Sequence, residues 1–233
     1  MSDKKNKMLR VPENFDDSHD SDVWSIFKIM GEFVDGYDKL FKIGPCVSIF
    51  GSSRMVEGDK YYEMARYTAK KVTEKGFGVI TGGGPGIMEA ANKGAQEGEG
   101  KSVGLGILLP HEQGVNKFVD NEYVINFNYF FARKVMFVKY AQGFIVFPGG
   151  FGTLDEFFEA MTLIQTQKIS TFPLVLIGKD YWKGLFDWIK ETMVKNGTIS
   201  EEDVNLFSLT DDPDEAVKIV CDFYQQHTLS PNF

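Results

Sequence analysis

Short apolar runs alternate with longer segments of helical periodicity along most of this chain. The runs are rich in β-branched and aromatic residues, which is typical of strands buried on both faces. They predict strands at residues 46–50, 78–81, 103–109, 144–147 and 174–177, with a weaker candidate at 123–127. Between them, helical spacing predicts helices at residues 59–74, 85–97, 129–141, 153–167 and 181–195. This alternation indicates an α/β protein with a Rossmann-like three-layer fold, a mainly parallel sheet and helices on both faces.

The two ends of the chain depart from this pattern. Residues 1–22 are charged and contain few large apolar side chains, so we expect a flexible N-terminal tail. Over residues 23–43, apolar side chains recur three and four positions apart, which predicts an amphipathic helix packed on the domain or on a neighbouring subunit. We assign residues 44–226 to a single Rossmann-like domain and residues 227–233 to a C-terminal tail.

Composition narrows the classes of ligand. The chain has 233 residues, 43% of them hydrophobic, which suits one core, and its net charge of -8 argues against nucleic-acid or membrane binding through bulk electrostatics. Cys46 and Cys221 are far apart and lack C-x-x-C spacing, so we expect no disulfide, no metal and a reducing cytoplasm. The N-terminus lacks the apolar core of a signal peptide, and no apolar run is long enough to span a membrane.

Two glycine-rich turns follow the first two predicted strands. The first carries Ser52, whose hydroxyl could donate to a ligand, although an ordinary turn with a serine cap fits equally well. The second reads Thr81-Gly82-Gly83-Gly84-Pro85-Gly86-Ile87-Met88-Glu89 and would bring the N-terminus of a helix up to an anion. Gly83, Gly84 and Met88 are therefore candidate contacts, unless the glycines serve only helix packing. The glycine spacing departs from G-x-G-x-x-G, so we expect no redox dinucleotide and no other cofactor.

A third turn, Pro148-Gly149-Gly150-Phe151-Gly152-Thr153, follows the strand at 144–147. Glycines permit positive φ and expose consecutive N–H groups, the following helix adds the positive end of its dipole, and Thr153 adds a hydroxyl. This combination predicts a phosphate site formed by Gly149, Gly150, Gly152 and Thr153. Because the turn lacks the lysine of a Walker A loop, it suits a terminal monophosphate rather than a metal-bound triphosphate.

Helix geometry ranks the charged residues near this turn. Arg133 and Lys134 are adjacent and point about 100° apart, so we expect only one of them to face the strand ends, and both are candidates. In the helix that follows the turn, Glu156 lies about 60° from Thr153 around the axis, whereas Asp155 lies about 160° away. If Thr153 holds the phosphate of a nucleoside monophosphate, Glu156 is the carboxylate that reaches the sugar.

Together these residues resemble the LOG (Lonely Guy) family of cytokinin riboside 5′-monophosphate phosphoribohydrolases. The resemblance covers residues 45–181, and the family motif P-G-G-x-G-T-x-x-E is met at every fixed position. It implies a Rossmann-like nucleotide-binding domain, a homo-oligomer with the site at or near a dimer interface, catalytic roles for Arg133 and Glu156, and phosphate binding by Gly149, Gly150, Gly152 and Thr153. The chain departs from the family in its first forty residues and at 110–121.

The implied reaction is hydrolysis of the N-glycosidic bond of a purine nucleoside 5′-monophosphate, AMP or a cytokinin riboside 5′-monophosphate, to the free base and ribose 5-phosphate. Related proteins were long labelled lysine decarboxylases, but no lysine is placed beside the phosphate turn to hold pyridoxal phosphate. A Ser-His-Asp hydrolase also fails, because His19, His111 and His227 lie in a tail, a loop and a C-terminal stretch. The remaining alternative is a non-catalytic nucleotide or cofactor carrier, which would gain nothing from Glu156 facing the ribose.

Overall fold

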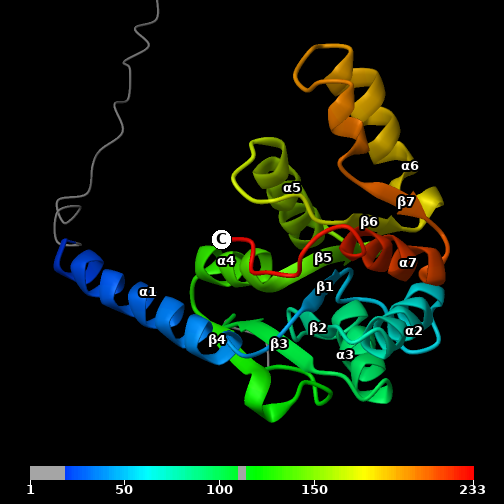
Figure 1. Cartoon of the computed structure of the whole chain (residues 1–233). Coiled ribbons are helices and arrows are strands. Elements are labelled where there is room, and N and C mark those ends of the chain that lie inside the picture. Colours follow the sequence, from blue (N-terminus) through cyan, green and yellow to red (C-terminus); the bar gives the residue numbers. More distant parts are fainter. Residues whose placement is uncertain (1–18, 110–113) are drawn as a thin grey trace, which may run out of the picture.

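A seven-stranded, all-parallel sheet forms the centre of the protein (Figure 1). The computed structural model describes residues 19–109 and 114–233. The strands lie in the order β4-β3-β2-β1-β5-β6-β7. Their bounds are β1 (Cys46–Phe50), β2 (Gly78–Thr81), β3 (Ser102–Ile107), β4 (Val124–Phe127), β5 (Ala141–Val146), β6 (Leu174–Ile177) and β7 (Ser208–Thr210). The predicted Rossmann-like α/β fold is confirmed.

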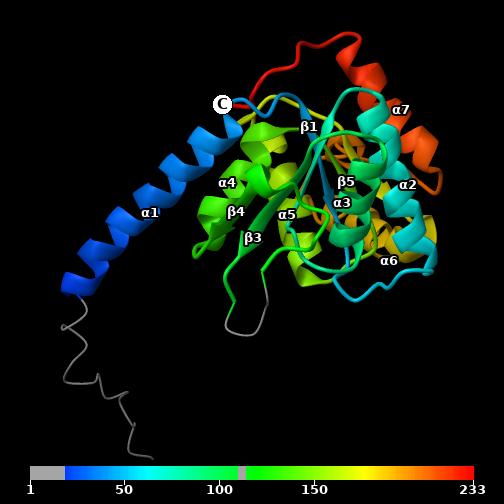
Figure 2. The same cartoon turned by 90° about the horizontal axis from the view of Figure 1, so that it is seen from below.

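Helices cover both faces of the sheet. They are α1 (His19–Leu40), α2 (Lys60–Glu74), α3 (Ile87–Glu97), α4 (Phe130–Tyr140), α5 (Phe151–Gln165), α6 (Lys179–Trp188) and α7 (Pro213–Tyr224). Figures 1 and 2 show α2, α3 and α7 on one side of the sheet and α4 and α5 on the other. The predicted helix at 181–195 is in fact α6 followed by a π-helical segment, Ile189–Val194.

The period-two alternation of β1 explains how one strand serves two cores. Val47 and Ile49 pack with side chains of α2, α3 and α7, whereas Cys46 and Phe50 pack with side chains of α4, α5 and α6. Successive side chains of a strand point to opposite faces, so a wholly apolar strand must be covered on both sides. Each layer of helices therefore depends on alternate residues of the same central strands.

Several expected boundaries differ from the observed ones. The weak strand candidate at 123–127 is real and becomes β4. Strand β7 was not predicted, because its three residues are too few to show a periodicity, and α7 was missed although its apolar residues recur at helical spacing. Strand β5 begins at Ala141, directly after α4 ends at Tyr140. Helix α1 begins at His19, before the predicted start of the helix. Most of the predicted tail, residues 1–18, lies outside the described residues, as does His111.

The order of the strands changes direction at the boundary between β1 and β5, which are neighbours in the sheet. Strands β2, β3 and β4 are added on one side of β1, and β5, β6 and β7 on the other. The turns that leave β1 and β5 therefore diverge and open a crevice at the carboxyl ends of the strands, which is where ligands bind in such folds. The Ser52 N–H donates to the Pro148 carbonyl oxygen at 2.9 Å and joins the two turns at the base of this crevice.

Candidate active site

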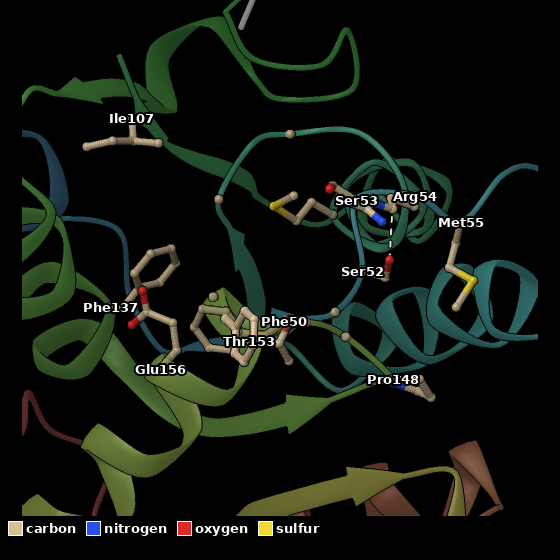
Figure 3. A pocket seen from close by; sticks show the side chains of 18 of the residues that line it. Phe50, Ser52, Ser53, Arg54, Met55, Ile107, Phe137, Pro148, Thr153 and Glu156 are labelled. Carbon is tan, nitrogen blue, oxygen red and sulfur yellow. Dashed lines mark hydrogen bonds between the residues drawn. The ribbon is translucent and has the colours of Figure 1, made fainter. Parts of the chain in front are cut away.

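An open cavity of about 640 Å³ lies at the carboxyl ends of the central strands (Figure 3). This volume falls within the usual range for small-molecule sites. The three glycine-rich turns, α4 and α5 all contribute to its walls, and Ile107 lines it from the end of β3. In Figure 3, Glu156 and Phe137 lie at one side of the cavity and Ser52 and Arg54 at the other.

Most of the residues singled out in the sequence line this cavity. They are Ser52, Gly84, Met88, Arg133, Gly149, Gly150, Gly152, Thr153 and Glu156. They come from four separate turns and helices, and the divergence of the chain at β1 and β5 brings them together. Two candidates, Gly83 and Lys134, are not among the lining residues.

Gly83 faces the opposite side of its turn. Its φ is +71°, and a Cβ added there would meet Val115 Cγ1 at 2.6 Å. Its N–H donates to Thr81 Oγ1 at 2.9 Å, and its carbonyl oxygen accepts from Asn116 Nδ2 at 3.0 Å. Gly83 thus fits its turn against the segment around Val115 rather than against a ligand.

Lys134 faces α5 rather than the cavity. Its Nζ is 2.8 Å from Asp155 Oδ1 and 3.4 Å from Glu159 Oε2, which ties α4 to α5. The angular separation of the two adjacent cations allows only one of them to face the cavity. That residue is Arg133. Asp155 is turned away in the same manner, with a side chain that is 55% exposed.

The turn at 148–153, which we expect to bind a phosphate, has a geometry that differs from the expected one. None of Gly149, Gly150 and Gly152 has a positive φ, so the turn is not an αR–αL nest. A Cβ on Gly149 would instead lie 2.1 Å from Thr153 Oγ1, so glycine is needed because the chain passes close to that hydroxyl. The N–H groups that remain for an anion are those of the first turn of α5, which begins at Phe151.

A residue that the sequence analysis missed holds this turn from outside. The Tyr181 hydroxyl of α6 donates to the Gly149 carbonyl oxygen at 2.7 Å, and Tyr181 lines the cavity. A contact between residues 32 positions apart leaves no local signal in the sequence. The apolar lining residues Phe50, Ile107, Leu109, Phe130 and Phe137 were also missed as site residues, since their spacing serves strands and helices equally well.

Glu156 and Arg133 face each other within the cavity wall. Arg133 Nη2 lies 3.7 Å from Glu156 Oε1, and the two side chains are 13% and 5% exposed. Burial raises the pKa of Glu156 to about 7, while the positive charges of Arg133 and Lys134 act to lower it. Glu156 Oε2 accepts no hydrogen bond from any of the described residues. The site thus contains a buried carboxyl group that can hold or release a proton near neutral pH and has one oxygen without a hydrogen bond from the described residues.

Arg133 is also held by aromatic rings. Its guanidinium carbon lies 5.1 Å from the ring centroid of Phe130 and 5.6 Å from that of Phe137. Such contacts stabilise a cation where little water is present. They also limit where the guanidinium can move, so its distance to Glu156 depends on the position of α4.

The described part of the chain offers no other class of site at the cavity. Within residues 19–109 and 114–233, no three His, Cys, Asp or Glu side chains are arranged to hold a metal ion. Among the described helices, none is both long enough and apolar enough to cross a membrane. His227 stacks on Phe223, and its Nδ1 lies 2.8 Å from the carbonyl oxygen of that residue, away from the cavity lining.

Comparisons with known proteins agree with this geometry. The family model described as "Possible lysine decarboxylase" matches residues 88–220. The pyrimidine/purine nucleotide 5′-monophosphate nucleosidase of Escherichia coli strain K12 is 31% identical over 149 residues, which are 58% of this chain and 32% of that protein. The chain thus spans about a third of the length of this relative. The "Probable cytokinin riboside 5′-monophosphate phosphoribohydrolase LOG4" of Oryza sativa subsp. japonica is 27% identical over 173 residues, 72% of this chain and 73% of that one.

Among solved structures, the molybdenum cofactor carrier protein MCP from Chlamydomonas reinhardtii has the same fold, with a TM-score of 0.56 at 22% identity over 78% of this chain and 99% of that one. A likeness at this identity concerns the fold alone. The family model covers more than half of the chain, and the motif that characterises the family lies in the cavity wall. The protein therefore belongs to the family described as possible lysine decarboxylases, to which the LOG phosphoribohydrolases belong.

Proposed function

We propose that the protein hydrolyses the N-glycosidic bond of a purine nucleoside 5′-monophosphate, such as AMP or a cytokinin riboside 5′-monophosphate, to the base and ribose 5-phosphate. The observation that carries this proposal is the buried Glu156 carboxyl group, which faces the cavity one helical turn beyond the phosphate turn. The names of the relatives point to the same bond, since they are a nucleotide 5′-monophosphate nucleosidase and a riboside 5′-monophosphate phosphoribohydrolase.

The phosphate is bound at the N-terminus of α5 in this proposal. Free N–H groups of the first helical turn, the positive end of the helix dipole and the Thr153 hydroxyl all favour an anion there. Gly149 and Gly150 leave the approach to these groups open. The pairing of Tyr181 with Gly149 keeps the turn in place as the phosphate enters.

The ribose then lies beside Glu156. The rise along a helix from Thr153 to Glu156 is about 4.5 Å, comparable to the step from a 5′-phosphate to the sugar ring. As the C1′–N bond breaks, its electron pair leaves with the base and positive charge develops on the ribose, which a nearby carboxylate stabilises. Water adds to C1′, Glu156 accepts a proton from that water, and this proton then passes to the departing nitrogen of the base, so that one water is consumed and Glu156 is again ionised. Arg133 keeps the carboxylate oriented, and the apolar side chains of Ile107, Leu109 and Phe130 receive the planar base.

One incubation separates hydrolysis from ligand carriage. We expect AMP to yield free adenine, detected by chromatography, and adenosine to be a far poorer substrate. Charge-assisted hydrogen bonds contribute roughly 1.5–3 kcal/mol each, so loss of the phosphate should lower kcat/KM by orders of magnitude. If calorimetry shows that AMP binds but chromatography shows no adenine, the protein is a carrier. Equal rates for AMP and adenosine would contradict the phosphate site.

We further propose a homo-oligomer, at least a dimer, with the site near a subunit interface. Large apolar side chains are exposed on α1, directly after it and at the cavity, including Trp24 at 67%, Phe41 at 78% and Phe151 at 92%. Apolar surface of this kind favours contact with a partner. We also propose a cytoplasmic location, with which the free thiols of Cys46 and Cys221 are compatible.

A further inference from the structure

Helix α4 carries Arg133 but does not cap its own N-terminus. The helix begins at Phe130, so Arg133 lies at the end of its first turn. The preceding residue, Tyr129, makes no side-chain capping hydrogen bond. The first N–H groups of a helix need acceptors from elsewhere, because they have no partner within the helix.

Glu32 of α1, almost one hundred residues away, accepts hydrogen bonds from the two residues that lead into α4. Its Oε1 accepts from the Asn128 N–H at 2.7 Å and from Asn128 Nδ2 at 2.8 Å. Its Oε2 accepts from the Tyr129 N–H at 3.3 Å. A carboxylate at this point also interacts favourably with the positive end of the α4 dipole. Glu32 therefore holds the start of α4 in place from another helix.

Close packing between the helices holds Glu32 in this position. At Gly36, one turn beyond Glu32, an added Cβ would lie 2.8 Å from Met136 Sδ of α4. Leu40, another turn further, is fully buried. Figures 1 and 2 show that the rest of α1 extends away from the body of the protein, so its C-terminal half forms the attachment. A segment outside residues 45–181 thus contributes to the position of α4, together with its packing on the sheet.

We propose that Glu32 is a positioning residue: by holding Asn128 and Tyr129 at the start of α4, it fixes Arg133 opposite Glu156. Its catalytic consequence rests on the proposed function, whereas its effect on the geometry does not. Without Glu32, the two residues that lead into α4, Asn128 and Tyr129, lose the acceptor for their backbone N–H groups. A frayed first turn would let Arg133 move away from Glu156, because Arg133 is joined to that turn through its N–H, which donates to the Tyr129 carbonyl oxygen at 3.3 Å.

The electrostatics of Glu156 offer a way to detect this movement. The charged groups that act on Glu156 are Arg133 and Lys134 of α4 and Asp155 and Glu159 of α5, while Arg54 lines the same cavity. Burial raises the pKa of Glu156, and Arg133 is the largest influence that lowers it. If Arg133 moves away, the pKa of Glu156 must rise further. Loss of the negative charge of Glu32 would by itself lower the pKa of Glu156. Movement of Arg133 and direct loss of charge therefore shift this pKa in opposite directions.

The experiment compares Glu32→Ala and Glu32→Gln in the full chain, with two controls. Asp38→Asn removes a carboxylate from an exposed position of α1. Asn232→Ala removes the hydrogen bonds that Asn232 Nδ2 donates to the Val138 and Ala141 carbonyl oxygens, at 2.6 and 2.8 Å, at the other end of α4. The Glu156 carboxyl group is titrated by carbon NMR with labelled glutamate, and its signal is assigned from its absence in Glu156→Gln. The pH profile of kcat with AMP is the second readout.

We expect Glu32→Ala to raise the pKa of Glu156 by about one unit, the lower range for loss of a neighbouring opposite charge. On the acidic side of the profile this lowers kcat by about tenfold, since each pKa unit changes the ionised fraction tenfold. Glu32→Gln should raise the pKa of Glu156 by less than Glu32→Ala does, because its amide oxygen still accepts from one N–H. Asp38→Asn should change neither readout, and Asn232→Ala should lower the melting temperature without moving the titration.

An unchanged or lowered pKa of Glu156 in Glu32→Ala would overturn the inference, as would an equal shift in Asn232→Ala. If the wild-type protein releases no adenine, the proposed function fails, but the NMR titration still decides the role of Glu32. If the wild-type protein is active and the titration does not move, the function stands and the positioning role fails.

Discussion

Arg133 Nη2 lies 3.7 Å from Glu156 Oε1, beyond the length of a good hydrogen bond but well within the range of charge interaction. The guanidinium therefore offsets only part of the cost of burying the carboxylate, and the pKa of Glu156 stays raised at about 7. A group poised near neutral pH can serve as both acceptor and donor of a proton. This relationship underlies the first three predictions below.

Substitution of the two neighbouring carboxylates should give opposite results. We expect Glu156→Gln to retain AMP binding but lose at least about a hundredfold in kcat, the lower range for a positioned acid-base group. Asp155→Asn is the matched control, because Asp155 pairs with Lys134 outside the cavity lining and should leave kcat little changed. Steady-state adenine release and calorimetry measure the two quantities. An active Glu156→Gln beside an inactive Asp155→Asn would refute the orientation of α5 toward the substrate.

The pH dependence of kcat/KM should report the ionisation of Glu156. Because the carboxylate is the active form, activity should be present above the pKa of about 7 and fall as the pH drops through it. Below that pKa, kcat/KM should fall about tenfold for each pH unit. The profile is measured with AMP, and the residual activity of Glu156→Gln should lack this ionisation. A profile in the active enzyme that stays flat down to pH values near the ordinary glutamate pKa would contradict the raised value.

The same ionisation should make the protein less stable at alkaline pH. The folded-state pKa of Glu156, about 7, lies above the ordinary glutamate value of 4.5, so the folded state binds this proton more tightly than the unfolded state. Its stabilising effect is complete below pH 4.5 and is lost as the pH rises through about 7. The shift corresponds to about 3 kcal/mol. Glu156→Gln should therefore melt at a higher temperature than the wild type at about pH 8 and at a similar temperature at about pH 5. Equal melting temperatures at both pH values would count against burial as the cause of the raised pKa.

The apolar surface of α1 should contribute to self-association. We expect light scattering to give at least twice the monomer mass of 26.3 kDa for the wild type. Trp24→Glu combined with Phe27→Glu should lower that mass, because both side chains are exposed apolar groups on α1. Lys28→Glu, an equally exposed position on the same helix, is the control and should leave the mass unchanged. A monomeric wild-type protein at micromolar concentration would contradict the proposal.

Local physical rules were enough to predict much of this protein from its sequence. Buried parallel strands and their helices each leave a periodicity within one segment, so the α/β fold and most elements were predicted. The glycine-rich turn at Gly149–Thr153 was identified because its residues are contiguous. The orientation of Glu156 relative to Asp155 also follows from one helix, since about 100° per residue fixes it without reference to any neighbour.

Contacts between distant segments decided the rest. That Arg133 rather than Lys134 faces the cavity depends on how α4 packs on the sheet, and that Gly83 faces Val115 depends on a segment more than thirty residues away. The contacts of Tyr181 with Gly149 and of Glu32 with Tyr129 likewise join elements that the sequence keeps apart. The raised pKa of Glu156 is of the same kind, because burial is a property of everything packed around a side chain and no local pattern contains it.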